Sequence, residues 1–194
     1  MNAFFLSCEG GRQVAQGASF EGLGFGLDRG DLRGSRLLLA AQHGDTAAFQ
    51  ELVVSYEAMV MRVALALTGS ENAAQEVYCN VFRDAFASVS RLDSCTSVFV
   101  WLHRILVRHC LDYCRRKRAV AGCQASATSP SLAGILRCLP PTERVVLVLR
   151  QSEGLKVRTL AEIFVCSQEH IVEVLQKGTN RLRTQVALGV RRIA

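Results

Sequence analysis

The sequence predicts an all-α protein: two small helical domains joined by a flexible linker, the second of which ends in a helix-turn-helix. Three observations support this fold class. From Ser35 onward, apolar residues recur at intervals of three and four, the period of amphipathic helices. Residues 119–131 consist mostly of Ala, Gly, Ser, Thr and Pro without periodicity, which is typical of a linker. No segment shows the apolar–polar alternation of a strand.

The first 34 residues differ from the rest of the chain. They hold eight of the fifteen glycines and show no sustained helical or strand period. This composition predicts a disordered N-terminal extension over residues 1–34, or a start of translation placed too early.

Residues 35–118 are expected to form a first domain of four helices. A short helix comes first, and Asp45 is a good N-cap for the long helix that follows it. Gly69 breaks that long helix, and Ser70 is expected to cap the third. The fourth helix is expected over Val98 to about Arg118.

Residues 132–194 are expected to form the second domain. A helix capped by Thr142 should end at Gly154, because glycine commonly terminates helices. Two further helices are expected over 157–164 and 168–188. The turn between them is so short that the pair is predicted to be a helix-turn-helix.

Composition narrows the classes of function. The net charge of +6 favours a polyanionic partner, although positive charge spread evenly over the surface would only keep the protein soluble. No apolar run reaches the about 18 residues of a membrane span, so we expect no membrane insertion and a cytoplasmic location. Phosphate-binding glycine loops, G-x-S-x-G and H-E-x-x-H are all missing from the sequence, which argues against an enzyme.

The eight cysteines include no C-x-x-C pair. Cys110 and Cys114 share a helix face, and with His103 and His109 nearby they could form a metal site. The alternative, core thiols and surface imidazoles, is the commoner arrangement for such residues. We therefore predict no metal and no cofactor.

Two segments carry features of nucleic-acid binding. The fourth helix has six cations opposed only by Asp112, together with Trp101 and Tyr113. Such a helix can follow phosphates while a ring stacks on an unpaired base, or it can be a solvated helix end that the helix dipole favours. The last helix of a helix-turn-helix can enter a major groove, or it can be a plain packing element.

Motifs along the chain, from about Leu37 to Arg183, resemble the extracytoplasmic-function class of RNA polymerase sigma factors. The resemblance is carried in chain order by Gly44-Asp45 with Ala48-Phe49, Thr68 to Glu71, Glu76-Val77 with Val81-Phe82, Phe99 to Ile105, Cys110 to Tyr113 with Arg115-Arg116, Leu139-Pro140, Glu143-Arg144, Glu153 to Leu155 and Leu160 to Ile163.

This resemblance implies an alternative sigma factor that directs bacterial RNA polymerase to promoters. Its partners would be promoter DNA, an anti-sigma factor, and the polymerase core through the clamp of the largest subunit and the flap. Residues 35–118 would be a sigma region 2-like domain and residues 132–194 a region 4-like domain. The Ser90 to Ser97 loop would receive a flipped base of the downstream promoter element.

The resemblance also implies three sets of contact residues. The downstream element would be bound by Trp101, Arg104, Arg108, Arg115, Arg116, Lys117 and Arg118. The upstream element would be bound, weakly, by Ser167, Gln168, His170, Lys177, Arg181 and Arg183. Polymerase would be bound by Glu76, Cys79, Asn80 and Phe82.

Several positions depart from the family pattern. Only Glu76 keeps the charge expected among the polar polymerase contacts, since Cys79 and Asn80 replace the other two, and Arg108 stands where the family usually has Asn. The second domain departs further at its basic positions and at its turn glycine: the residues here are Val165, Glu169, Val172, Glu173 and Val174. A β-branched residue such as Val165 is not expected at positive φ. These changes leave open an alternative function, that of a degenerate sigma-like protein acting by contact with polymerase or a regulator.

Overall fold

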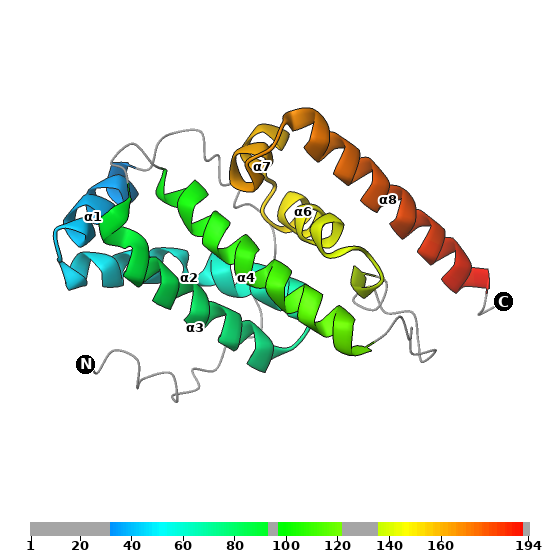
Figure 1. Cartoon of the computed structure of the whole chain (residues 1–194), viewed down its shortest axis with the longest axis horizontal. Coiled ribbons are helices and arrows are strands. Elements are labelled where there is room, and N and C mark those ends of the chain that lie inside the picture. The colour runs from blue at the N-terminus through cyan, green and yellow to red at the C-terminus, as the bar shows by residue number, and fades with distance from the viewer. Residues whose placement is uncertain (1–31, 93–96, 122–135, 192–194) are drawn as a thin grey trace, which may run out of the picture. The chain divides into compact units, whose positions relative to one another are not determined.

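A computed structural model describes residues 32–92, 97–121 and 136–191. Within these ranges all regular elements are helical, as the sequence predicts (Figure 1). The elements are α1 (Leu32–Gln42), α2 (Thr46–Thr68), α3 (Glu71–Ser88), the 3₁₀ turn η2 (Val89–Arg91), α4 (Val98–Ala121), α6 (Pro141–Ser152), α7 (Val157–Phe164) and α8 (Gln168–Arg191).

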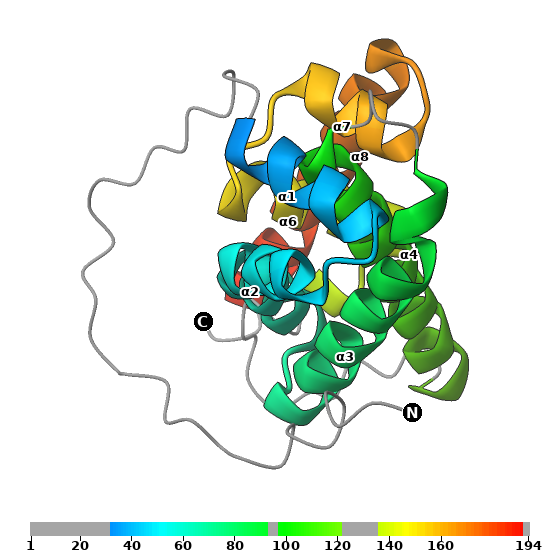
Figure 2. The ribbon, with the colours of Figure 1, turned by 90° about the vertical axis from the view of Figure 1, so that its left-hand side faces the viewer.

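The helices form two packed modules, which are in contact with each other. In the first module, α2 lies against α1, α3 and α4, and α3 lies against α4 (Figure 2). In the second module, α8 packs on both α6 and α7. The two modules contact each other where α6 meets α2 and α4, and where α7 meets α4. Residues Asp31–Ala194 therefore cluster in one compact unit.

Local signals fix the ends of α2. The Asp45 carboxylate accepts hydrogen bonds from the backbone N–H groups of Ala47 and Ala48, at 2.9 and 3.1 Å, and so caps the first turn. At the other end Gly69 adopts a left-handed conformation, φ 66°, and its N–H donates to the Leu65 carbonyl at 2.8 Å. Both predicted ends are confirmed.

The start of α6 differs from the prediction. The helix begins at Pro141, one residue before Thr142, so Thr142 is inside the first turn and is not the cap. Proline fits this position because its missing N–H belongs to the first turn, where no intrahelical acceptor exists. The helix ends before Gly154, which has φ 64°.

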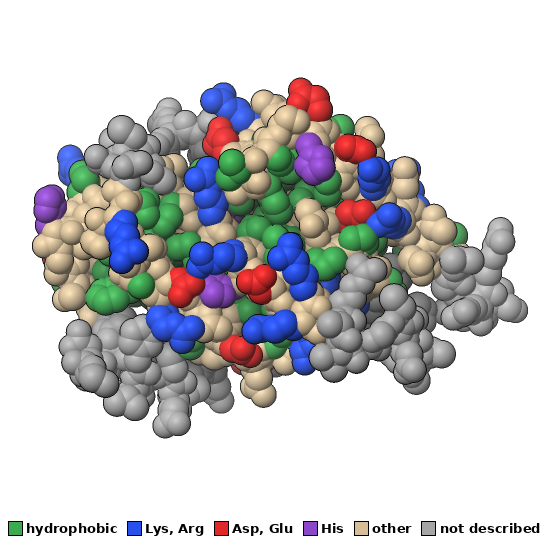
Figure 3. Space-filling model, in the orientation of Figure 1, with side chains coloured by type: hydrophobic (Ala, Val, Ile, Leu, Met, Phe, Trp, Pro, Cys, Tyr) green, Lys and Arg blue, Asp and Glu red, His purple; other side chains and the backbone are tan. Residues whose placement is uncertain are grey.

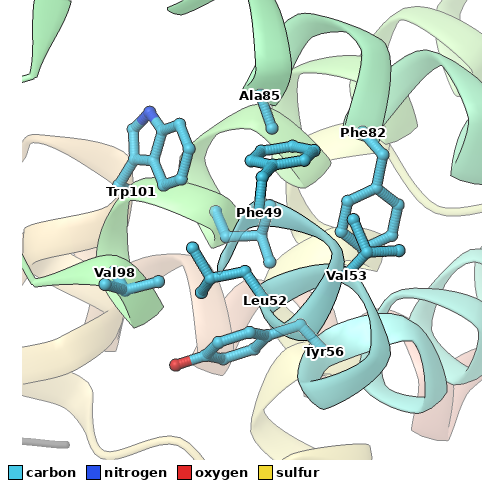
Figure 4. Close-up of a pocket in the computed structure, with 9 residues that line it drawn as sticks. Phe49, Leu52, Val53, Tyr56, Phe82, Ala85, Val98 and Trp101 are labelled. Carbon is cyan, nitrogen blue, oxygen red and sulfur yellow. The ribbon is translucent and has the colours of Figure 1, made fainter. Parts of the chain in front are cut away.

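The core of the first module contains two residues that the family resemblance predicts to be binding residues. Trp101 and Phe82 are each 8% exposed, and they line a cavity of about 10 Å³ between α2, α3 and α4 (Figure 4). That volume holds about one water molecule. The other residues around it are Phe49, Leu52, Val53, Tyr56, Ala85, Val98 and Leu102. Trp101 and Phe82 are thus packing residues, because the fold covers the helix faces that carry them.

Parts of three predicted segments lie outside the described residues. They are the N-terminal extension up to residue 31, the linker from residue 122 onward, and residues 93–96 of the expected base-binding loop. Where the description resumes, two predicted boundaries shift. Helix α1 already begins at Leu32, inside the predicted extension, and α4 continues to Ala121, inside the predicted linker.

Candidate nucleic-acid interface

The C-terminal part of α4 presents exposed cations in weak pairs. The guanidinium groups of Arg115 and Arg116 approach the carboxylates of Asp112 and Glu76 at 3.4 and 3.9 Å, and both arginine side chains are more than 60% exposed. Ion pairs as exposed as these contribute about 0–1 kcal/mol, so phosphates can compete for both arginines. Lys117 Nζ lies 5.8 Å from the centre of the Tyr113 ring. The side chain of Arg118 lies outside the described residues.

Arg108, nearer the middle of α4, has a stronger partner. Its guanidinium donates to the Asp84 carboxylate of α3 at 2.5 Å, and His109 Nε2 lies 2.9 Å from the same oxygen. Although desolvation opposes ionisation, the hydrogen bond and charge of His109, with those of Arg108, lower the pKa of Asp84. Asp84 therefore neutralises part of the basic helix. No sequence signal joins residues 24 positions apart on different helices.

Lys and Arg side chains gather over α4 and α3, with Asp and Glu side chains among them (Figure 3). Arg104, near the start of α4, is exposed but already has a hydrogen-bond partner. Its Nε and Nη2 atoms donate to the Glu162 carbonyl of α7, at 3.3 and 2.9 Å. Among the described residues of the predicted downstream set, Arg115, Arg116 and Lys117 form a cluster of exposed cations that have only weak partners.

The predicted polymerase contacts lie on α3, but only part of the set is exposed. Glu76 is exposed, and Cys79 and Asn80 are half-buried. The Asn80 side chain accepts a hydrogen bond from Arg83. Phe82 packs inside the module edge-to-face with Tyr78, with ring centres 4.8 Å apart. An accessible polymerase surface on α3 would therefore be formed by the three polar residues.

The turn between α7 and α8 corrects one sequence expectation. Val165 adopts the left-handed conformation, with φ 53° and ψ 52°, although it is β-branched. It is the only non-glycine residue at positive φ in the described part of the chain. Its side chain is 76% exposed, so no packing contact compensates for a conformation that costs about 1–2 kcal/mol for an L-residue. The turn thus has the backbone conformation that glycine adopts most readily, although the residue here is Val165.

The beginning of α8 is acidic. Glu169 and Glu173 are exposed, and local hydrogen bonds lower the pKa of both carboxyls. Glu173 pairs with Lys177 at 2.5 Å and lies 4.0 Å from His170. The Ser167 hydroxyl accepts a hydrogen bond from the His170 N–H at 3.2 Å, which makes Ser167 a helix cap. Two predicted upstream contacts, Lys177 and Ser167, are therefore already engaged.

Further along α8, buried packing explains two more sequence features. Val174 is 8% exposed, so its apolar character is a requirement of the core and not a lost DNA contact. Val172, by contrast, is 40% exposed. Arg181 donates at 2.7 Å to Glu143 of α6, whose side chain is only 10% exposed. Arg181 thus anchors α8 to α6, while Gln168 and Arg183 are exposed.

Most of the residues of the possible thiol–imidazole metal site are buried in the hydrophobic core. Cys110 and Cys114 are buried, and burial raises the pKa of both thiols. His103 is also fully buried, not on the surface as expected, and desolvation lowers its pKa to about 4. His103 Nδ1 lies 2.8 Å from the Phe99 carbonyl, and His109 is engaged with Asp84. Among the described residues, no three His, Cys, Asp or Glu side chains are grouped as metal ligands.

Comparison with known proteins connects this geometry to a family. Residues 52–120, from within α2 to the end of α4, match the family model of sigma-70 region 2. This part of the chain is a sigma-70 region 2-like segment. The match supports the resemblance to sigma factors over these residues. No curated protein sequence matches the chain.

Two solved structures show the same fold. CnrH, in complex with the cytosolic domain of CnrY, has a TM-score of 0.66 at 22% identity, over 80% of this chain and 98% of that chain. The sigma factor RpoE of Bartonella quintana, in complex with the anti-sigma factor NepR, has a TM-score of 0.56 at 18% identity, over 72% and 96%. No helix among the described residues is both long and apolar enough to cross a membrane.

Proposed function

We propose that this chain is an alternative sigma factor that recruits bacterial RNA polymerase to promoters and opens them mainly through its first module. The observation that carries the proposal is the exposed cluster Arg115, Arg116 and Lys117 at the end of α4, inside the segment that matches sigma-70 region 2. Cations in weak surface pairs can exchange a carboxylate for a phosphate at little cost.

The downstream promoter element would be held by this cluster with Arg118, and by Arg108 once it leaves Asp84. Asp84→Asn should free Arg108, since it removes the charge that holds the guanidinium at 2.5 Å. One additional phosphate contact would steepen the dependence of log K on log salt by about 0.9 for duplex DNA. Titrations of promoter binding at several salt concentrations would measure this change. A slope equal to that of the unmodified protein would mean that Arg108 does not reach the DNA.

Polymerase would dock on α3 through Glu76, Cys79 and Asn80. Glu76→Lys reverses the charge of the exposed acid and should weaken the complex with core enzyme. The matched control is Glu57→Lys, an exposed acid on α2. Equal affinities of the two variants in a binding titration would remove α3 from the proposed polymerase surface.

An anti-sigma protein is proposed as a further partner, in keeping with the complex in which RpoE is held by NepR. The second module is proposed to bind the polymerase flap and to contact the upstream element weakly through Gln168, His170 and Arg183. We propose a cytoplasmic location, because RNA polymerase is found there. No enzymatic activity of its own is required for this function.

A second candidate function is that of a degenerate sigma-like protein acting by protein contact. It is favoured by one observation: the start of α8 combines the exposed acids Glu169 and Glu173 with the exposed apolar side chains of Val165 and Val172. Acids at this position repel phosphates, whereas an apolar patch bordered by charge fits a protein surface.

The experiment that decides between the two candidates is transcription by purified core polymerase with and without this protein on fragmented genomic DNA. A sigma factor starts transcripts at a subset of promoters. Failure to form a stable complex with core enzyme would remove the first proposal. A stable complex that starts no transcript would favour the second.

A further inference from the structure

The start of α6 buries a cation that has no anionic partner. Arg144 is the fourth residue of α6 and is only 6% exposed, and its Nε atom is buried without a hydrogen-bond partner. No ion pair between described residues includes Arg144. The dipole of the helix is positive at this end and disfavours a cation. A buried charge of this kind is strongly destabilising unless an anion compensates it.

The carboxylates at the two ends of α6 already serve other cations. Glu143, at the start of the helix, accepts a hydrogen bond from Arg181 of α8 at 2.7 Å, and its second oxygen is buried without a partner. At the other end, Arg62 of α2 donates to both carboxylate oxygens of Glu153, at 2.7 and 3.0 Å. Arg144 thus lacks the carboxylate partner that these two arginines have.

A second arginine lies close to Arg144. Arg137, just before α6, is exposed, and its Nη2 atom lies 3.2 Å from the position that a Cβ atom on Gly69 would take. Desolvation raises the pKa of Tyr113 of α4, while the charges of Arg137 and Arg144 oppose this rise. Burial also raises the pKa of the Cys114 thiol, and the charge of Arg144 again opposes the rise. Both guanidinium groups are therefore near the Tyr113 side chain.

Positive charge is in excess around Tyr113. Besides the two arginines, Lys117 Nζ lies 5.8 Å from the centre of the Tyr113 ring. Glu76 is the one carboxylate whose charge acts on the pKa of Tyr113 in the described part of the chain, and it pairs with Arg116 at 3.9 Å. The charges of Arg137 and Arg144 are thus left without compensation by the described residues.

We propose that Arg137, Arg144 and the Tyr113 hydroxyl form a binding site for a small solute that carries phosphate groups, at the contact between α4 and the start of α6. Two guanidinium groups offer planar sets of N–H donors that match phosphate oxygens, and the phenol adds one further donor. The proposal does not depend on the function proposed above.

The burial of Arg144 favours a small solute over DNA. The phosphates of a DNA strand follow one another along a continuous backbone, so they reach cations that project from the surface, such as those at the end of α4. A small solute can enter a contact between two helices and meet a guanidinium that is only 6% exposed.

The test uses the full chain and inorganic pyrophosphate as the probe, with sodium chloride at equal ionic strength as the reference. The variants Arg144→Met and Arg137→Met each remove one cation of the site. The matched control is Arg36→Met, which removes an exposed arginine from α1. Isothermal titration calorimetry measures the affinity for pyrophosphate, and thermal unfolding measures the stability with and without it.

Pyrophosphate should bind the unmodified protein and Arg36→Met with equal affinity and should raise the unfolding temperature of both. Arg144→Met and Arg137→Met should each bind it about tenfold or more weakly, because each loses charge-assisted hydrogen bonds to the anion. In chloride alone, Arg144→Met should unfold at the same temperature as the unmodified protein or higher, because the substitution removes a buried cation without a partner.

The proposal would be overturned if the unmodified protein did not bind pyrophosphate. It would also be overturned if Arg137→Met bound pyrophosphate as tightly as Arg36→Met, a comparison that stands even if Arg144→Met does not fold. A lower unfolding temperature of Arg144→Met in chloride, with its affinity for pyrophosphate unchanged, would assign Arg144 to packing alone.

A duplex oligonucleotide, titrated in parallel, distinguishes the two sources of phosphate. We expect Arg144→Met to bind the duplex as the unmodified protein does. If Arg144→Met lost affinity for the duplex and kept its affinity for pyrophosphate, the phosphate that Arg144 binds would belong to DNA, and the small-solute site would be overturned.

Discussion

Helices α4 and α8 are each 24 residues long, and the family pattern predicts a DNA contact for both, yet they use their cations differently. Helix α4 ends in exposed arginines whose carboxylate partners are also exposed. Helix α8 begins with exposed acids and directs Arg181 inward to the nearly buried Glu143. Whether the cations of a helix can bind phosphate therefore depends less on their number than on the carboxylates already beside them.

The largest expected effect concerns the two valines of α8. Val174→Lys would bury a charge without a partner and should destabilise the protein by about 3–5 kcal/mol. Val172→Lys, on the 40% exposed side chain, should change stability by less than about 0.5 kcal/mol. Urea unfolding would compare them. Equal losses would mean that the two valines do not differ in burial.

The second largest expected effect is the loss of stability at low pH that the buried histidine of α4 causes. His103 of α4 has a pKa lowered to about 4, whereas the His170 side chain of α8 is 57% exposed. Protonation is harder in the folded protein than in the unfolded chain, so His103 should cost up to about 3 kcal/mol of stability as pH falls from 6.5 towards 4. Above pH 6.5 it should have no effect.

Unfolding free energies at pH 7.5 and 5 would test this prediction. His103→Phe should remove most of the pH dependence in this window, and His170→Gln should retain it. A pH dependence that survives in His103→Phe would assign the acid sensitivity to other groups.

The third expected effect is on DNA binding. Replacing Arg115 and Arg116 together with Ala should lower the salt slope for duplex promoter DNA by about 1.8, since each lost phosphate contact contributes about 0.9. Replacing Lys177 and Arg183 of α8 should lower it less, because Lys177 is already paired with Glu173. Equal reductions of the salt slope in the two double variants would mean that α4 and α8 contribute equally to DNA binding.

The smallest effect is expected at the turn before α8. Val165→Gly should stabilise the protein by about 0.5–1 kcal/mol, because glycine adopts positive φ without steric cost but gains entropy when unfolded. Val172→Gly, inside the helix, should destabilise it by a similar amount. Thermal unfolding of both variants would check the signs, and a destabilised Val165→Gly would contradict the strain assigned to this turn.

The helices of the fold could be predicted from the sequence more fully than the contacts of the candidate site. Asp45 and Gly69 act through contacts within a few residues, so their capping functions could be read from the sequence. The burial of Trp101 could not, because helical periodicity shows which residues share a face but not which face another helix covers. The partners of Arg62 and Arg104 lie 91 and 58 positions away, and only the packing of the modules brings them together.

Footprinting of promoter DNA by polymerase holoenzyme containing this protein tests the central claim most directly, because it reports both modules in one measurement. We expect strong protection and strand opening at the downstream element, where α4 would bind, with weak protection upstream, where the acidic start of α8 would lie. Strong upstream protection without downstream opening would contradict it.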